Sequence, residues 1–205
     1  MSNIEDIKAA LNIAHNGNNN RSKEAIEFLG KFKKSAKPNS LFDVAKALTG
    51  SVRQLHYSSQ LCKRIVEIVD DENALASVRD FALNVVLKFS NPSQRNARNF
   101  FHVIVSWIAI KSSEWKPQMV CTYVNSILTK DTYNIRGMCS LLEFLKTLPE
   151  ELGNRGTNHL VTKKRKKLIS DTFRSGVRQY VLSLSFSLSL PWSHLEMTII
   201  SLGCV

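Results

Sequence analysis

The chain has 205 residues, enough for one or two ordinary domains, and 43% of them are hydrophobic, which is sufficient for a real core. Only 8 glycines and 5 prolines interrupt it, which favours a helical chain over an all-β sandwich. The formal net charge of +11, to which the run Lys163–Lys167 contributes strongly, makes nucleic acid or an acidic protein the default class of partner.

The sequence does not predict a disulfide-rich, metal-binding, membrane-spanning or secreted protein. The four cysteines have no C-x-x-C spacing, which favours buried free thiols over disulfides or zinc ligands. The five histidines show no i, i+4 pairing with one another or with a carboxylate cluster, so no metal site is expected. There is neither an apolar run of about 18 residues, as a transmembrane helix needs, nor a secretory signal. We therefore expect a protein of the cytosol or nucleus, without a membrane partner and without a cofactor.

The dominant pattern is a series of amphipathic helices separated by short polar breaks. The first three are expected to end at Asn16–Asn20, before Lys37–Ser40, and at Gly50. The fourth runs from Val52 to Val69. Its apolar residues recur every 3 or 4 positions and predict one buried face: Val52, Leu55, Ser59, Cys62, Val66 and Val69.

Further helices are expected as far as Pro149, which should end the last of them or change its register. Asp70 and Asp71 suit the positive end of the helix that follows them. Asn91-Pro92 is typical of a new helix start, and another helix should follow Pro117. These helices arrive in antiparallel pairs of roughly 35 to 45 residues, a period that favours a HEAT or armadillo-type solenoid. The sequence therefore predicts an all-α superhelix of about four helix pairs over residues 1–174, with an irregular helical domain as the alternative.

Residues 175–205 differ in kind. Residues 181–190 alternate apolar residues with serine, which is typical of a strand or of low complexity. We interpret residues 175–205 as an atypical tail on a truncated or alternatively ended product.

Three stretches resemble the N-terminal region of importin-β superfamily transport receptors, in particular the transportin-SR and importin-thirteen branch. Ala9–Gly50 resembles their opening repeat, and His56–Ile65 (HYSSQLCKRI) resembles the helix that follows. Leu141–Arg155 (LLEFLKTLPEELGNR) is similar to their Leu-Leu-x-x-Leu-x-x-Leu-Pro-Glu-Glu segment and is the most specific of the three. Residues 66–115 match only as helices, and the family is usually acidic and much longer.

The resemblance implies a receptor for protein import into the nucleus that shuttles between nucleus and cytoplasm. Its partners would be the small GTPase Ran in its GTP form and, less specifically, cargo proteins and nucleoporins. Ran-GTP would dock on the inner helices of the repeats, which we expect at Arg21–Lys34, Ser51–Val69 and Arg95–Lys111. On the second of these, four residues fall away from the apolar stripe and are the candidate partner-binding residues: Gln54, Tyr57, Lys63 and Arg64.

The basic run near the end of the predicted superhelix has three possible roles. Lys163–Lys167 is a nuclear localisation signal, a nucleic-acid patch, or a solvated loop between helices.

Glu150 and Glu151 diverge by about 100° on a helix and so do not form an acid–base pair. No phosphate-binding loop or nucleophile elbow is present, so an enzyme is not expected. Trp107 is expected in the core.

The rival functions are a basic helical nucleic-acid-binding module and a HEAT-repeat scaffold that is indifferent to the nucleotide on Ran.

Overall fold

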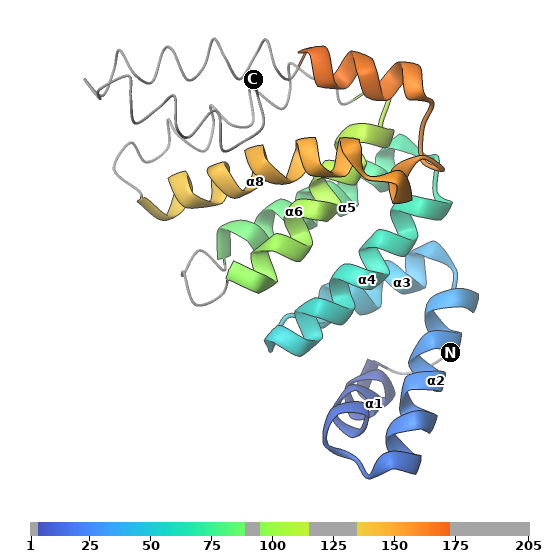
Figure 1. Ribbon diagram of the computed structural model, residues 1–205. Helices are drawn as coiled ribbons and strands as arrows, with labels where there is room; N and C mark the ends of the chain where they lie inside the picture. The colour runs from blue at the N-terminus through green and yellow to red at the C-terminus, as the bar shows by residue number, and fades with distance from the viewer. Residues whose placement is uncertain (1–3, 89–94, 115–134, 173–205) are drawn as a thin grey trace. The chain divides into compact units, whose positions relative to one another are not determined.

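The computed structural model describes residues 4–88, 95–114 and 135–172 (Figure 1). Every regular element within these residues is helical, which confirms the all-α prediction. The helices are α1 (Ile4–Asn16), α2 (Asn19–Ser35), α3 (Pro38–Ala47), α4 (Val52–Ile68), α5 (Glu72–Lys88), α6 (Arg95–Lys111), α8 (Ile135–Gly153) and a 3₁₀ turn at Arg155–Thr157. Residues 163–172 are also helical. The helix expected after Pro117 and the alternating stretch 181–190 lie outside the described residues.

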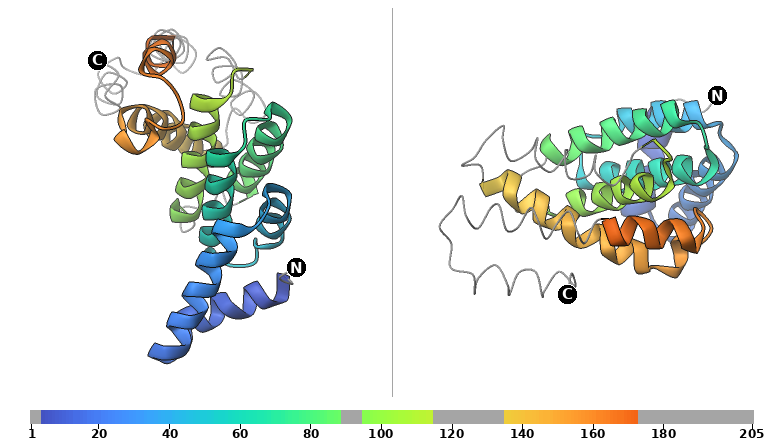
Figure 2. Two further views of the ribbon diagram at one scale, coloured as in Figure 1. Left: turned by 90° about the vertical axis from the view of Figure 1, so that its right-hand side faces the viewer. Right: turned by 90° about the horizontal axis from the view of Figure 1, so that it is seen from above.

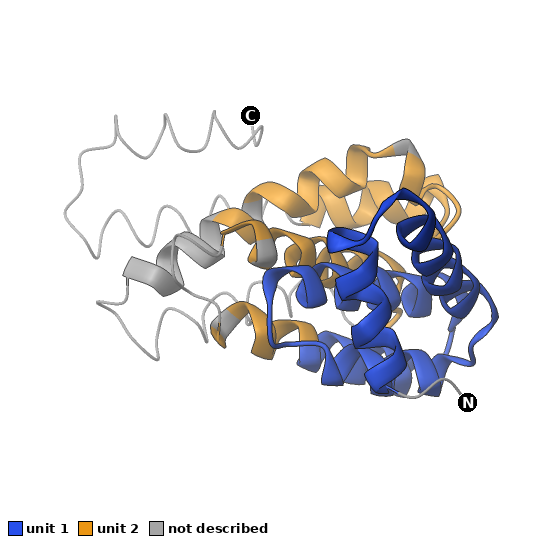
Figure 3. Cartoon of the chain, turned by 90° about the horizontal axis from the view of Figure 1, so that it is seen from below, with its two compact units in different colours: residues 1–81 blue, residues 82–205 orange. Residues whose placement is uncertain are grey.

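The chain divides into two compact units, residues 1–81 and 82–205, which Figure 3 colours separately. The division falls within α5. In the first unit α1 packs against α2 and α3 packs against α4, and in the second α6 packs against α8. The α6–α8 pair stays side by side in both views of Figure 2. The domain boundary expected at residue 174 lies outside the described residues.

Side chains at the helix starts of the first unit follow the ordinary rules for N-caps. The side chains of Asn18, Ser51 and Asp71 each accept a hydrogen bond from a backbone N–H in the first turn of α2, α4 and α5, at 3.2, 3.2 and 2.8 Å. Such bonds satisfy amides that have no partner inside the helix. The Asp71 cap agrees with the predicted start of α5.

The polar segments between α1 and α2 and between α2 and α3 are shorter than the sequence predicted. Pro38, expected within the break, is the first residue of α3, because a helix start needs no N–H at that position and the ring fixes a helical φ. Gly17 lies between α1 and α2, where its N–H donates to the Ile13 carbonyl at 2.7 Å. A Cβ at Gly17 would lie 2.5 Å from that oxygen, so the connection requires glycine.

The buried face of α4 agrees with the prediction in its middle but not at its start. Leu55, Ser59, Cys62 and Val66 are buried, whereas Val52 is 51% exposed. Helical side chains lean toward the N-terminus, so the first residue of a helix projects past its end. Cys62 is a fully buried free thiol, as expected, and burial raises its pKa to about 12. The side chains of the other three cysteines lie outside the described residues.

The core of the second unit is built largely from α6. Trp107 is 2% exposed, which confirms it as a core residue, and its indole N–H donates to a carboxylate oxygen of Glu151 at 2.6 Å. The expectation that Pro149 ends the last helix is wrong, since α8 continues to Gly153 with Pro149 inside it. Leu148 is fully buried and Glu151 holds Trp107, so contacts on both sides of the proline stabilise this last turn.

Candidate functional site

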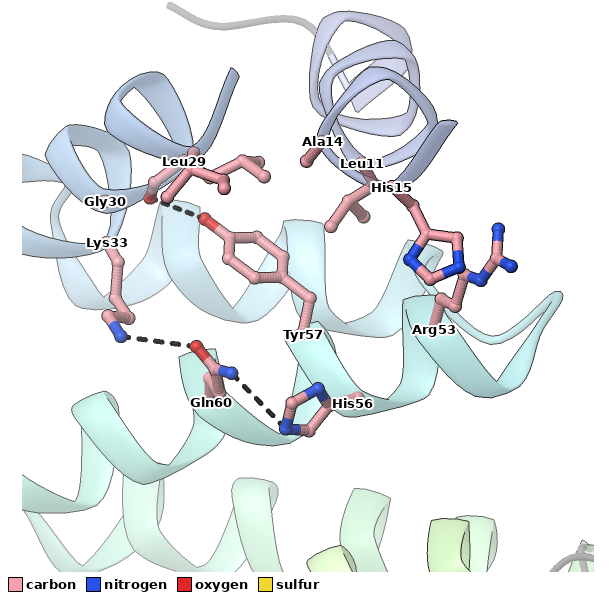
Figure 4. A pocket seen from close by; sticks show the side chains of 11 residues that line it. Leu11, Ala14, His15, Leu29, Gly30, Lys33, Arg53, His56, Tyr57 and Gln60 are labelled. Carbon is pink, nitrogen blue, oxygen red and sulfur yellow. Dashed lines mark hydrogen bonds between the residues drawn. The ribbon is translucent and has the colours of Figure 1, made fainter. Parts of the chain in front are cut away.

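An open pocket of about 490 Å³ lies between α1, α2 and α4 of the first unit (Figure 4). A volume in this range is ordinary for a ligand-binding pocket. Its walls come from three helices that are separate in the sequence: Leu11, Ala14, His15, Ile26, Leu29, Gly30, Lys33, Arg53, His56, Tyr57 and Gln60.

The apolar part of the pocket is formed by α1 and α2. Leu11 and Ala14 face it from α1, and Leu29 and Ile26 face it from α2. Ile26 is 59% exposed, which is unusual for an isoleucine that has a partner to pack against. Gly30 completes the wall, and a Cβ built there would meet no atom within 4 Å. The space beside Gly30 is therefore open to an apolar group from outside.

The polar part of the pocket is a short chain of hydrogen bonds between α2 and α4. The Lys33 ammonium donates to the Gln60 side-chain oxygen at 3.3 Å, and the Gln60 amide nitrogen lies 3.4 Å from Nε2 of His56 (Figure 4). His56 and Gln60 are one helical turn apart and so share one face of α4. These contacts hold Lys33 at the edge of the pocket.

The charged side chains that line the pocket are all positive. Lys33 and Arg53 carry positive charges, two histidines accompany them, and no carboxylate is among the lining residues. Arg53 forms no ion pair within the part of the chain that the structure describes. In Figure 4 the ring of Tyr57 lies between Lys33 on one side and Arg53 on the other. A cation without a carboxylate beside it favours an anionic ligand.

Tyr57 is the one predicted partner-binding residue that lines this pocket. The expectation that it falls away from the apolar stripe is wrong, because its side chain is 6% exposed. Its hydroxyl donates to the Leu29 carbonyl at 2.7 Å, and burial raises the pKa of the phenol. Tyr57 thus joins α4 to α2 and forms the floor of the pocket.

The other three predicted residues, Gln54, Lys63 and Arg64, lie outside the pocket. The Gln54 side chain accepts from the Gly50 N–H at 2.9 Å and supports the start of α4. Lys63 is partly exposed. Arg64 forms an ion pair with Glu67 at 3.2 Å, and its Nε is buried without a hydrogen-bond partner.

The fold brings together three basic residues from α1, α2 and α4 that were not predicted from the sequence: His15, Lys33 and Arg53. No local pattern marks them as a site, because they lie on three different helices and only the fold brings them together. The His56–Gln60 spacing was visible within the quoted stretch HYSSQLCKRI, but only the fold shows that Lys33 reaches it.

A second group of charged residues, which we call the buried charge cluster, joins α6 to α8 in the second unit. Two nitrogens of Arg98 each donate to one carboxylate oxygen of Glu143 at 2.9 Å, although Arg98 is only 2% exposed. Arg95 lies 3.3 Å and His102 3.7 Å from the same carboxylate. A bidentate pair of this kind fixes the register of the two helices.

The titration of the buried charge cluster follows from its surroundings. Burial alone would raise the pKa of Glu143, but the hydrogen bonds from His102 and Arg98 and the charge of Arg98 outweigh it and bring the pKa to about 2. Burial lowers the pKa of His102 and outweighs the opposing effect of Glu143. The cluster is therefore an ionised carboxylate between arginines, beside a neutral imidazole.

The basic run Lys163–Lys167 is not a solvated loop, since it forms the first turns of a helix. Arg165 donates to the carbonyl oxygens of Ile110, at 3.0 Å, and Ser112. Lys166, 8% exposed, donates to the Asn154 carbonyl at 3.0 Å. Its other acceptors are the side chains of Thr157 and, at 3.1 Å, Asn158. Two of the five cations therefore serve the packing of the second unit, which weakens the reading of the whole run as a partner-binding patch.

Within the described residues, no group of three histidine, cysteine or acidic side chains is placed to hold a metal ion. Across that same part of the chain, no helix combines the length and apolarity that crossing a membrane would require. No protein-family model matches the chain, and no characterised protein matches it.

Proposed function

We propose that the chain is a helical-repeat protein that binds another protein through α2 and α4, in the manner of the N-terminal region of an importin-β-type receptor. The packed pairs α1–α2 and α3–α4 are then the first units of a HEAT-type solenoid, and α5, α6 and α8 belong to later ones. The partner is Ran in its GTP form, with cargo proteins and nucleoporins as further partners. The setting is protein import by a receptor that shuttles between nucleus and cytoplasm.

The observation that carries this proposal is the open basic pocket between α1, α2 and α4. The two ranges expected to face the partner, Arg21–Lys34 and Ser51–Val69, coincide closely with α2 and α4. These helices provide Lys33 and Arg53, and the pocket contains no carboxylate that would neutralise them. A surface of this kind favours an acidic partner protein over a small apolar ligand.

The nucleic-acid alternative is less well supported. It is favoured by the net charge of +11 and requires the basic run at residues 163–167, but Arg165 and Lys166 within that run are bonded to the protein itself. The remaining cations of the run, Lys163, Lys164 and Lys167, are exposed and contribute three positive charges to the net charge of +11.

The test is calorimetric titration of the whole chain with Ran loaded with GTP or with GDP. We expect a clear preference for the GTP form, weakened by Arg53→Glu. Equal affinity for the two forms would replace the transport proposal with that of a scaffold indifferent to the nucleotide. No binding by a sample that circular dichroism shows to be folded would contradict Ran as the partner.

A further inference from the structure

We propose that the pocket between α1, α2 and α4 binds a short acidic peptide segment, one apolar side chain of which inserts beside Gly30. The inference rests on the proposed function only in assigning this pocket to protein binding, and it does not require the partner to be Ran. Three features of the pocket carry it: its apolar wall, the gap at Gly30 and the arrangement of its cations.

The apolar wall needs an apolar occupant. Leu11 and Ala14 on α1 face Leu29 and the exposed Ile26 on α2 across the pocket. An inserted aliphatic or aromatic side chain would remove this surface from water, which is the main driving force for such binding. A purely ionic ligand would leave that surface in contact with solvent.

The gap at Gly30 is not needed for the packing of the protein. No atom lies within 4 Å of a Cβ built at this position, so no neighbouring helix requires glycine here. Glycine inside a helix is less stable than alanine. Its presence in the middle of α2 leaves room in the pocket wall, and that room is where the inserted side chain would lie.

The cations determine the rest of the ligand. Lys33 and Arg53 lie on opposite sides of the Tyr57 ring in the view of Figure 4, and Gln60 holds the Lys33 ammonium at 3.3 Å. A peptide that places its apolar side chain over Tyr57 would direct carboxylates on either side toward the two cations. The ligand class is therefore a segment with an apolar residue between acidic ones.

The experiment measures fluorescence anisotropy of a fluorescein-labelled peptide, Gly-Asp-Glu-Phe-Asp-Glu-Gly, with the whole chain at low and moderate salt. We expect saturable binding that weakens with ionic strength. It should weaken at least about tenfold when the phenylalanine is replaced by serine, or when the carboxylates are replaced by their amides. Binding unaffected by the serine replacement would contradict the inserted side chain.

Two matched pairs of variants locate the site. Lys33→Glu should weaken binding strongly while Lys34→Glu should not, because Lys34 is exposed on the same helix but does not line the pocket. Gly30→Phe should abolish binding by filling the gap, and Gly30→Ala should leave it within about twofold, since a methyl group fits the open space. Equal effects of the two lysine variants, or full binding by folded Gly30→Phe, would overturn the proposal.

The outcome can be separated from that of the Ran experiment. Peptide binding without a response to Ran leaves the pocket as a peptide site and removes only the Ran proposal. Ran-GTP binding with no peptide binding removes this inference and leaves the proposed function in place.

Discussion

The single residue with the largest expected effect on stability is Glu143, the carboxylate of the buried charge cluster. Glu143→Gln keeps the shape of the side chain but removes the negative charge to which the buried guanidinium of Arg98 donates two hydrogen bonds. Breaking a buried pair from one side destabilises by about 3 kcal/mol or more. Urea unfolding should therefore show a large loss in the free energy of unfolding.

The matched control for that variant is Glu150→Gln on the same helix. The Glu150 carboxylate lies 3.8 Å from Lys146, and both side chains are exposed. Exposed pairs of this geometry contribute about 0.5 kcal/mol or less. Equal losses for the two variants would show that the cluster does not act as a buried pair.

The same cluster predicts how stability depends on pH. Below about pH 6.5, where histidine titrates in an unfolded chain, the unfolded state binds more protons because burial lowers the pKa of His102 in the fold. The free energy of unfolding should therefore fall on acidification. A second loss follows below about pH 4.3, because the folded Glu143 has a pKa of about 2 and its contribution disappears as the pH falls toward that value.

The measurement is urea unfolding at intervals from pH 7 to pH 3. His102→Gln should remove the loss of stability that begins near pH 6.5 and leave a smaller loss below about pH 4.3, because Arg98 still lowers the pKa of Glu143. A wild-type chain equally stable at pH 7 and pH 5 would contradict the buried neutral imidazole.

Tyr57 gives a smaller prediction at the scale of one residue. Tyr57→Phe removes the hydroxyl that donates to the Leu29 carbonyl across the α2–α4 contact. A buried hydrogen bond of this type contributes about 1 kcal/mol. We expect thermal and urea unfolding to show a loss of that size. A variant as stable as the wild type would mean that water replaces the bond.

At the scale of the element, the start of α4 depends on Ser51. Ser51→Ala should cost about 1 kcal/mol, because the hydroxyl accepts from the Gln54 N–H in the first turn. Ser77→Ala is the control, since the Ser77 hydroxyl is exposed and donates to the Asn73 carbonyl one turn earlier in α5. It should change the free energy of unfolding by less than about 0.5 kcal/mol. A larger loss for Ser77→Ala than for Ser51→Ala would contradict the capping role of Ser51.

The helices are the part of the fold that the sequence predicted well, because each carries its own apolar period and its own start signals. Asp71 illustrates this, since a local rule placed it at the start of α5 and its side chain caps that helix. The exceptions are positions where long-range packing outweighs a local rule. Pro149 is a helix breaker by local chemistry, yet α8 passes through it because Glu151 and Leu148 are held by contacts with other segments.

The candidate pocket was predictable only in part, because it depends on how three helices meet. Periodicity placed Tyr57 off the apolar stripe of α4, but the carbonyl that its hydroxyl binds belongs to α2, 28 residues earlier. The buried charge cluster was missed for the same reason, since Arg98 and Glu143 are 45 residues apart. No local pattern reveals a contact of that range.

At the scale of the whole molecule, the net charge of +11 predicts weak binding to any polyanion. A DNA duplex should bind at 50 mM salt and be released by about 200 mM. Exchanging Lys163, Lys164 and Lys167 for glutamine should weaken this binding without changing the melting temperature, because these three side chains are exposed whereas that of Lys166 is buried and hydrogen-bonded. Sequence-selective binding that persists at 200 mM would favour the nucleic-acid module.

The buried thiol of Cys62 can report how often the first unit opens. Its sulfur is fully buried, and a thiol with a pKa of about 12 is almost never ionised near neutral pH. Reaction with an aromatic disulfide reagent must therefore wait until α4 separates from its neighbours. The labelling rate, followed by mass spectrometry of the peptide that contains Cys62, measures how often that opening occurs under native conditions. A peptide or partner that binds only the closed form of the first unit should slow this reaction by a factor that grows with its concentration relative to its dissociation constant, so binding can be followed through Cys62 without a label on the ligand.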